Sequence, residues 1–110
     1  MLGPAPQTVG GHDERRNALR ATVRISADLR RPGRTPFQVK VCDISLTGCQ
    51  IETVARVNSG EQIWLTLPGI APIEGIIRWV SHSGLGCQWV RPIYPAVFDH
   101  IRQRFPDSLA

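Results

Sequence analysis

The chain has 110 residues, of which 42% are apolar, and this leaves room for one domain around one hydrophobic core. No stretch approaches the roughly 20 apolar residues of a membrane-spanning helix, and the first residues lack the charged and apolar regions of a secretory signal. The net charge of +4 is uneven, because residues 1–40 hold eight basic and three acidic side chains (+5), whereas residues 41–110 hold five and six (−1). We therefore expect no membrane span, and we expect the basic character to serve the first third of the chain.

Residues 1–13 are rich in Gly, Pro and Gln and are predicted to form a flexible leader, with the folded domain at residues 14–110. From Ala21 to Ala27, apolar residues alternate with Thr, Arg and Ser, which predicts a half-buried strand. Further strand-like segments follow, separated by turns such as Pro32-Gly33 and Pro68-Gly69. The predicted strands cover residues 21–27, 37–41, 49–53, 63–67, 73–81 and 85–90.

The period changes after Pro95. Val97, Phe98, Ile101 and Phe105 recur at helical spacing with polar residues between them, which predicts an amphipathic helix that packs on the mouth of the β structure. Short strands at intervals of about ten residues are typical of a small barrel or sandwich. The expected fold is therefore all-β: a six-stranded antiparallel β-barrel with one C-terminal α-helix.

Catalytic and metal-binding patterns are missing. The cysteines Cys42, Cys49 and Cys87 have no CxxC or Cys/His spacing that suggests zinc, and we interpret them as buried thiols in a reducing cytoplasm. No metalloprotease, hydrolase, phosphate-loop or dinucleotide motif occurs either. We predict a cytoplasmic protein that is not an enzyme, with no metal and no cofactor.

A pair of arginines is the first informative motif. Arg16 and Arg20 are four residues apart, a spacing that puts both side chains on one face of either a helix or a strand. Two guanidinium forks that point the same way suit two phosphates, or the O6 and N7 acceptors of guanine. A solvated basic strand has the same spacing, so the pair alone does not decide between the two.

The second motif is Asp43-Ile-Ser45-Leu-Thr-Gly48, at the end of a predicted strand. A carboxylate is a natural acceptor for the N1–H and N2–H₂ donors of guanine, and a serine hydroxyl suits a phosphate oxygen. Gly48 is predicted to supply a positive φ before the next strand. An ordinary turn between two strands is the other interpretation of this segment.

Taken together, RxxxR followed by a strand pair and then DxSxxG resembles the PilZ family of cyclic di-GMP receptors. The resemblance covers residues 14–105 and includes a Gly-x-x-x-Trp strand from Gly75 to Trp79 and a closing strand that begins near Gly86. It implies a bacterial β-barrel that binds cyclic di-GMP, changes conformation, and regulates a downstream effector protein.

By that resemblance, Arg16 and Arg20 would bind the guanines and phosphates of the ligand. Asp43 would take the Watson–Crick edge of a guanine, Ser45 a phosphate, and Gly48 would keep the loop tight. These roles come from the family and not from the spacing of the residues.

An additional arginine, Arg15, precedes the RxxxR pair, and family members with this feature tend to bind an intercalated dimer of the ligand. Trp79 is assigned to the site as a residue beside a base, with a core or rim aromatic of the barrel as the alternative. We also expect the nearby basic turn to help offset the charge of two ligand molecules; it contains Arg30, Arg31 and Arg34.

Two other functions remain open from the sequence. A small basic barrel can bind RNA or single-stranded nucleic acid on aromatic platforms, but the predicted strands expose no aromatic cluster, so nucleic acid is the less favoured partner. A PilZ-like protein-interaction adaptor without a ligand is the second alternative, and the intact motifs argue against it.

Overall fold

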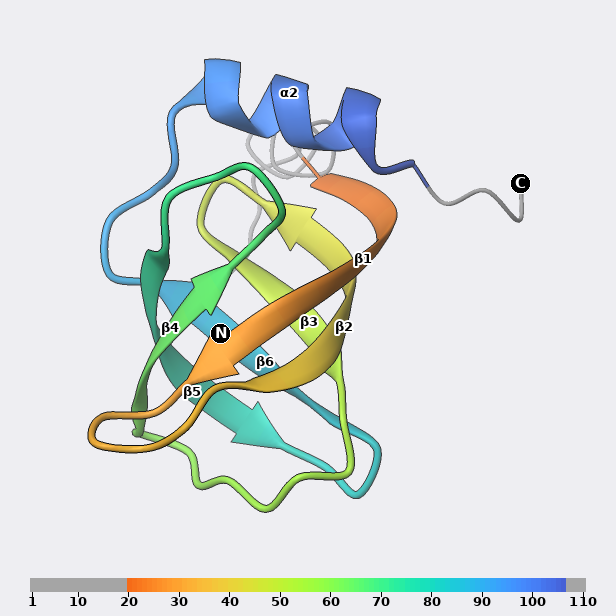
Figure 1. The fold of residues 1–110 in the computed structure, drawn as a ribbon. Helices are drawn as coiled ribbons and strands as arrows, with labels where there is room; N and C mark the ends of the chain where they lie inside the picture. The colour runs from red at the N-terminus through yellow and green to blue at the C-terminus, as the bar shows by residue number, and fades with distance from the viewer. Residues whose placement is uncertain (1–19, 107–110) are drawn as a thin grey trace, which may run out of the picture.

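Strands in which buried and exposed residues alternate close into a barrel in the computed structural model (Figure 1). The structure describes residues 20–106. The predicted leader, residues 1–13, lies outside this range, as do Arg15 and Arg16. The elements are β1 (Arg20–Arg30), β2 (Phe37–Ser45), β3 (Gly48–Glu52), β4 (Gln62–Thr66), β5 (Ile73–Val80), β6 (Gly84–Trp89) and α2 (Pro95–Arg104). Neighbouring strands are antiparallel, and their order around the closed barrel is β1-β2-β3-β6-β5-β4. The predicted fold class is confirmed.

The core fills the inside of the barrel with one face of each strand. In β1, Val23, Ile25, Ala27 and Leu29 are buried, and the polar residues between them are exposed, as the alternation predicts. Each fully buried Leu or Ile contributes roughly 1.5–3 kcal/mol relative to an exposed one. The side chains with no exposed surface are Leu29, Val41, Ile44, Ile63, Leu65, Leu67, Ile77, Leu85 and Ile101.

The C-terminal helix covers one end of the barrel (Figure 1). Pro95 occupies its first turn, where a missing N–H leaves no hydrogen bond unmade. Phe98 and Ile101 are buried in the barrel core, and Pro106 forms an antiparallel bridge with Val23 of β1. The predicted amphipathic helix is confirmed. Within residues 20–106, no helix has the length and apolar character needed to cross a membrane.

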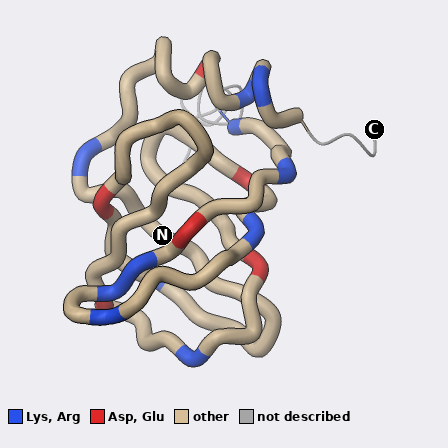
Figure 2. Tube along the Cα trace, in the orientation of Figure 1, with Lys and Arg blue, Asp and Glu red and all other residues tan. Residues whose placement is uncertain are grey.

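Basic residues gather at the hairpin between β1 and β2, at the lower left of Figure 2. There the guanidinium carbon of Arg30 lies 4.4 Å from the ring centroid of Trp64. Arg20 lies at the other end of the 11-residue strand β1, about 30 Å away along the chain at roughly 3.3 Å per residue. The expectation that Arg30, Arg31 and Arg34 offset ligand charge beside Arg20 is therefore wrong.

Candidate functional site

An open pocket of about 260 Å³ lies where β1 begins, beside the turn that joins β2 to β3. Strands β1, β2, β3, β5 and β6 all contribute to its walls. Every described residue that the sequence assigned to the site lines this pocket: Arg20, Asp43, Ser45, Gly48 and Trp79. The barrel thus brings together residues that lie up to about sixty positions apart in the chain. Whether Arg15 and Arg16 join them lies outside the described residues.

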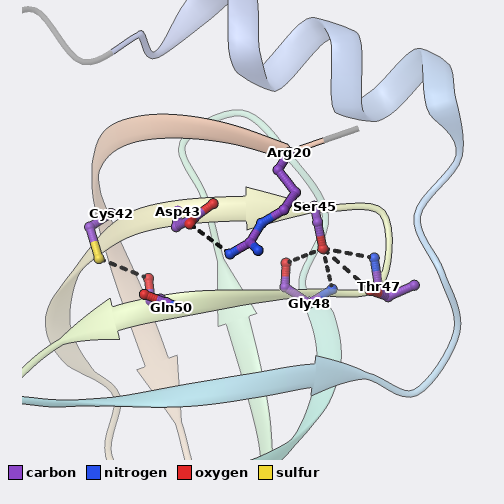
Figure 3. Close-up of polar contacts among 7 residues, drawn as sticks. All are labelled: Arg20, Cys42, Asp43, Ser45, Thr47, Gly48 and Gln50. Carbon is purple, nitrogen blue, oxygen red and sulfur yellow. Dashed lines mark hydrogen bonds and ion pairs between the residues drawn. The ribbon is translucent and has the colours of Figure 1, made fainter. Parts of the chain in front are cut away.

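Arg20 and Asp43 form an ion pair across the mouth of the pocket (Figure 3). A terminal guanidinium nitrogen of Arg20 donates to Asp43 Oδ2 at 3.0 Å. In the register of β1 and β2, Arg20 lies opposite Ser45 and Thr22 lies opposite Asp43, so the pair is a diagonal contact on one face. The side chains keep 45% and 27% of their surface exposed, so both remain accessible to a ligand.

A β-bulge turns Asp43 to the outside. Val41 pairs with Ile51 of β3 and Asp43 pairs with Gln50, which leaves Cys42 as an extra residue in β2. Strict alternation would point Asp43 inward with Val41. With the bulge, Val41 and Ile44 are both buried, and Asp43 faces the pocket.

The thiol of Cys42 lies on the outer side of this bulge and is half-buried, so it differs from the buried thiol that we expected. It contacts the carbonyl oxygen of Gln50 at 3.5 Å. Burial, together with the negative charges of Glu52 and Asp43, raises the pKa of Cys42. A neutral thiol therefore adjoins the Asp43 carboxylate and adds no negative charge to the site.

Cys49 and Cys87 face each other across β3 and β6, and both are buried and unbridged, as expected for reduced thiols. The hydrogen bond between the two thiols, reinforced by burial, raises the pKa of Cys49 well above its ordinary value, and the same hydrogen bond lowers the pKa of Cys87. Among residues 20–106, no three His, Cys, Asp or Glu side chains come together as metal ligands.

Ser45 holds the tight turn between β2 and β3. Its Oγ accepts hydrogen bonds from the N–H groups of Thr47 and Gly48, both at 3.2 Å (Figure 3). The hydroxyl lies 3.3 Å from both the Gly48 carbonyl oxygen and Thr47 Oγ1. These contacts give Ser45 the turn-forming role that serine has in many loops, at a position that also lines the pocket.

The turn is also held by the last residue of β6 and by the segment that follows β6. Trp89 is 3% exposed, and its indole N–H donates to the Ser45 carbonyl oxygen at 3.2 Å. The backbone N–H of Trp89 donates to Thr47 O at 2.8 Å, and that of Ile93 to Leu46 O at 2.9 Å. Hydrogen bonds from both sides give the pocket a rigid wall.

Gly48 is needed for a close backbone approach, and the prediction that it supplies a positive φ is wrong. The glycines with positive φ in the described chain are Gly33, Gly60 and Gly69, all in turns. A Cβ on Gly48 would instead overlap the carbonyl oxygen of Cys87 in β6. The motif glycine therefore allows β3 and β6 to approach closely.

Trp79 lies at the rim of the pocket and not in the core. It pairs with Gly86 of β6, and a Cβ on Gly86 would overlap the indole ring. The ring therefore lies on the surface that the glycine leaves free, and 45% of Trp79 stays exposed. An aromatic face in this position can stack on a base.

Four polar side chains in the pocket were missed by the sequence analysis: Thr47, Gln50, Arg78 and Gln88. Arg78 lies inside the predicted strand of residues 73–81, and a charge within this mostly apolar segment is a signal that could have been noticed. The glutamines carry no motif and enter the pocket through the strand register alone. Gln50 lies opposite Asp43, and Gln88 lies opposite Gly48.

The PilZ domain family model matches residues 14–104. Among solved structures, the chain resembles the Bacillus subtilis inhibitor of motility (MotI/DgrA), with a TM-score of 0.59 and 13% sequence identity. The match covers 78% of this chain and 47% of that one, so the chain spans about half its length, and at this identity the likeness shows the fold alone. No curated protein sequence matches the chain.

Proposed function

Since this chain belongs to the PilZ domain family, a family of cyclic di-GMP receptors and adaptors, we propose that it binds cyclic di-GMP and thereby regulates a partner protein. It acts without catalysis and without a cofactor, in the cytoplasm of a bacterium. The proposal rests on the observation that residues of the RxxxR and DxSxxG motifs lie side by side in the structure. Arg20 of the first contacts Asp43 of the second at 3.0 Å, on the wall of one pocket.

Each group has a distinct task toward the ligand. The Asp43 carboxylate accepts from the N1–H and N2–H₂ groups of a guanine. The Arg20 fork donates to a phosphate or to the O6 and N7 atoms of a guanine. Ser45 holds the turn and presents its hydroxyl toward a phosphate, and Trp79 provides a stacking face.

Binding requires the ion pair between Arg20 and Asp43 to rearrange. An exposed pair of this kind contributes about 0–1 kcal/mol, so exchanging it for contacts with a ligand costs little. The ligand then supplies an anion to the arginine and donors to the carboxylate, which replaces one weak pair by two complementary ones.

The arginines that precede β1 close the site. A pocket of about 260 Å³ is small beside the roughly 300–1,000 Å³ of typical ligand sites, so the barrel covers one side of the ligand. Arg16 is four residues before Arg20, and an extended chain spans at most about 14 Å over that length. Arg16 is therefore within reach of the pocket, and its fork can cover the outer side of the ligand. A ligand bound at this place then changes the surface that the protein offers to its partner.

Isothermal titration calorimetry of the full chain with cyclic di-GMP tests the proposal, with GTP and single-stranded RNA as competitors. We expect saturable binding that neither competitor displaces at equal concentration. Displacement by RNA would favour the nucleic-acid function, and an absence of cyclic di-GMP binding would favour an adaptor without a ligand.

Asp43→Ala should weaken the preference for guanine more than the binding of phosphate. The carboxylate pairs with base donors that adenine lacks, and its removal also releases Arg20 for a phosphate. The measurement is the ratio of the affinities for cyclic di-GMP and cyclic di-AMP in the wild type and the variant. A loss of both affinities in equal proportion would show that Asp43 does not read the base.

Arg15 sets the stoichiometry in our proposal, by holding a second, intercalated ligand molecule. Because the hairpin arginines lie at the far end of β1, the positive charge for a second ligand must come from the N-terminal segment and the pocket itself. Saturating calorimetry should give two ligands per chain for the wild type and close to one for Arg15→Ala. One ligand per chain in both proteins would contradict the dimer.

A further inference from the structure

Arg78 is a second cation in the pocket, and its surroundings differ from those of Arg20. The charged residues among the described residues that line the pocket are Arg20, Asp43 and Arg78. Arg20 and Asp43 neutralise each other at 3.0 Å. The side chain that Arg78 contacts is the neutral amide of Gln88, so the wall of the pocket keeps one positive charge that its own carboxylate does not balance.

A β-bulge places Arg78 on the pocket side. Ile77 pairs with Cys87 of β6 and Trp79 pairs with Gly86, which leaves Arg78 as an extra residue in β5. The bulge turns the consecutive side chains of Arg78 and Trp79 to the outer surface, where both are exposed and both line the pocket. The cation and the aromatic ring are thus brought to one wall by the same irregularity.

Gln88 orients the guanidinium group. The Nε–H of Arg78 donates to Gln88 Oε1 at 2.8 Å. This bond uses one of the five N–H donors of arginine, and the four on the terminal nitrogens are not committed to Gln88. A guanidinium held at Nε loses less freedom when its terminal nitrogens bind an anion, so part of the ordering cost is met before the ligand arrives.

We propose that Arg78 binds a phosphate of cyclic di-GMP from the rigid barrel, with Gln88 as its positioning residue. The proposal rests on the function proposed above and adds to it a phosphate contact outside the two sequence motifs. A phosphate is the favoured partner because the group brings the negative charge that this wall of the pocket lacks.

Arg78→Ala should lower the affinity for cyclic di-GMP about tenfold and should make the affinity less sensitive to NaCl, because one charge–charge contact is removed. Arg78→Lys should recover part of the affinity, since an ammonium keeps the charge but not the planar fork. Arg34→Ala is the matched control. It removes the same charge from the far hairpin and should leave the affinity and its salt dependence unchanged.

Gln88→Glu tests the charge argument without touching Arg78. It would give Arg78 a carboxylate partner, as Asp43 is for Arg20, and the affinity should fall by about the same factor as in Arg78→Ala. Gln88→Ala removes the positioning contact but adds no charge, and should cost a few-fold in affinity with little change in salt dependence. Circular dichroism melting curves of all variants establish that each is folded.

The outcomes separate this inference from the function on which it rests. If the wild type binds cyclic di-GMP and Arg78→Ala and Gln88→Glu both keep wild-type affinity, the role of Arg78 is overturned and the receptor function stands. If the wild type does not bind cyclic di-GMP, both are overturned. If Arg78→Ala fails to fold, Arg78→Lys and Gln88→Glu still decide, because both keep a long polar side chain at an exposed position.

Discussion

Replacing Arg20 by alanine should lower the affinity for cyclic di-GMP by ten- to a hundredfold and leave the free energy of unfolding within about 1 kcal/mol of the wild type. The affinity falls because a bidentate, charge-assisted contact of about 1.5–3 kcal/mol is lost. Stability changes little because the ion pair with Asp43 is largely exposed, and such pairs contribute about 0–1 kcal/mol. Calorimetric titration gives the affinity, and urea unfolding gives the stability.

Arg20→Lys is the informative companion variant. It keeps the charge and the ion pair with Asp43, but an ammonium cannot make the planar fork, so we expect it to fail nearly as badly. Arg16→Ala should show the same loss of affinity if both arginines of the motif contact the ligand. Unchanged affinity in either alanine variant would remove that arginine from the site.

Gly48→Ala should destabilise the fold by about 1–3 kcal/mol and weaken ligand binding with it, because the added methyl group overlaps the backbone of β6. The Cys87 carbonyl oxygen cannot swing aside as a side chain can, so β3 and β6 must separate. Gly48 also donates to Ser45 Oγ, and that separation disturbs the turn on the pocket wall. Thermal and urea unfolding measure the first effect, and titration of the folded variant with cyclic di-GMP measures the second.

Gly33→Ala is the matched control for this substitution. Gly33 has a φ of 71° and nothing within 4 Å of an added Cβ, so alanine there costs roughly 1–2 kcal/mol in backbone strain without a collision. Gly33 lies in the hairpin at the far end of β1, so the affinity of the Gly33→Ala variant for cyclic di-GMP should stay at the wild-type value. A Gly48→Ala variant with wild-type stability would mean that β3 and β6 tolerate a wider spacing than the structure has.

The order of strands, turns and helix is local information, and it can be read from the sequence. A strand that buries one face needs apolar residues at every second position, and Val23, Ile25, Ala27 and Leu29 of β1 meet this need without reference to the rest of the chain. The helical spacing of Phe98 and Ile101 is local in the same sense. The two motifs could be located for a similar reason, since each is a short run of neighbouring residues.

Contacts between neighbouring strands decided which side chains face the pocket and where a glycine is required. Periodicity cannot locate a bulge, because the extra residue is defined by the partner strand, and the bulges at Cys42 and Arg78 turn Asp43 and Trp79 toward the pocket. The need for glycine at position 48 likewise comes from a carbonyl oxygen in β6 that lies far away in the sequence.

The arrangement of the charged residues in space likewise could not be read from the sequence. The sequence by itself determined that the first third of the chain is basic and that Arg20 belongs to an RxxxR motif. The tertiary structure alone separated Arg20 from the hairpin arginines by the length of β1 and brought Arg78 to the pocket in their place. The physical reason is that charge acts through space, and the positions of charges in space follow from strand length, register and closure of the barrel.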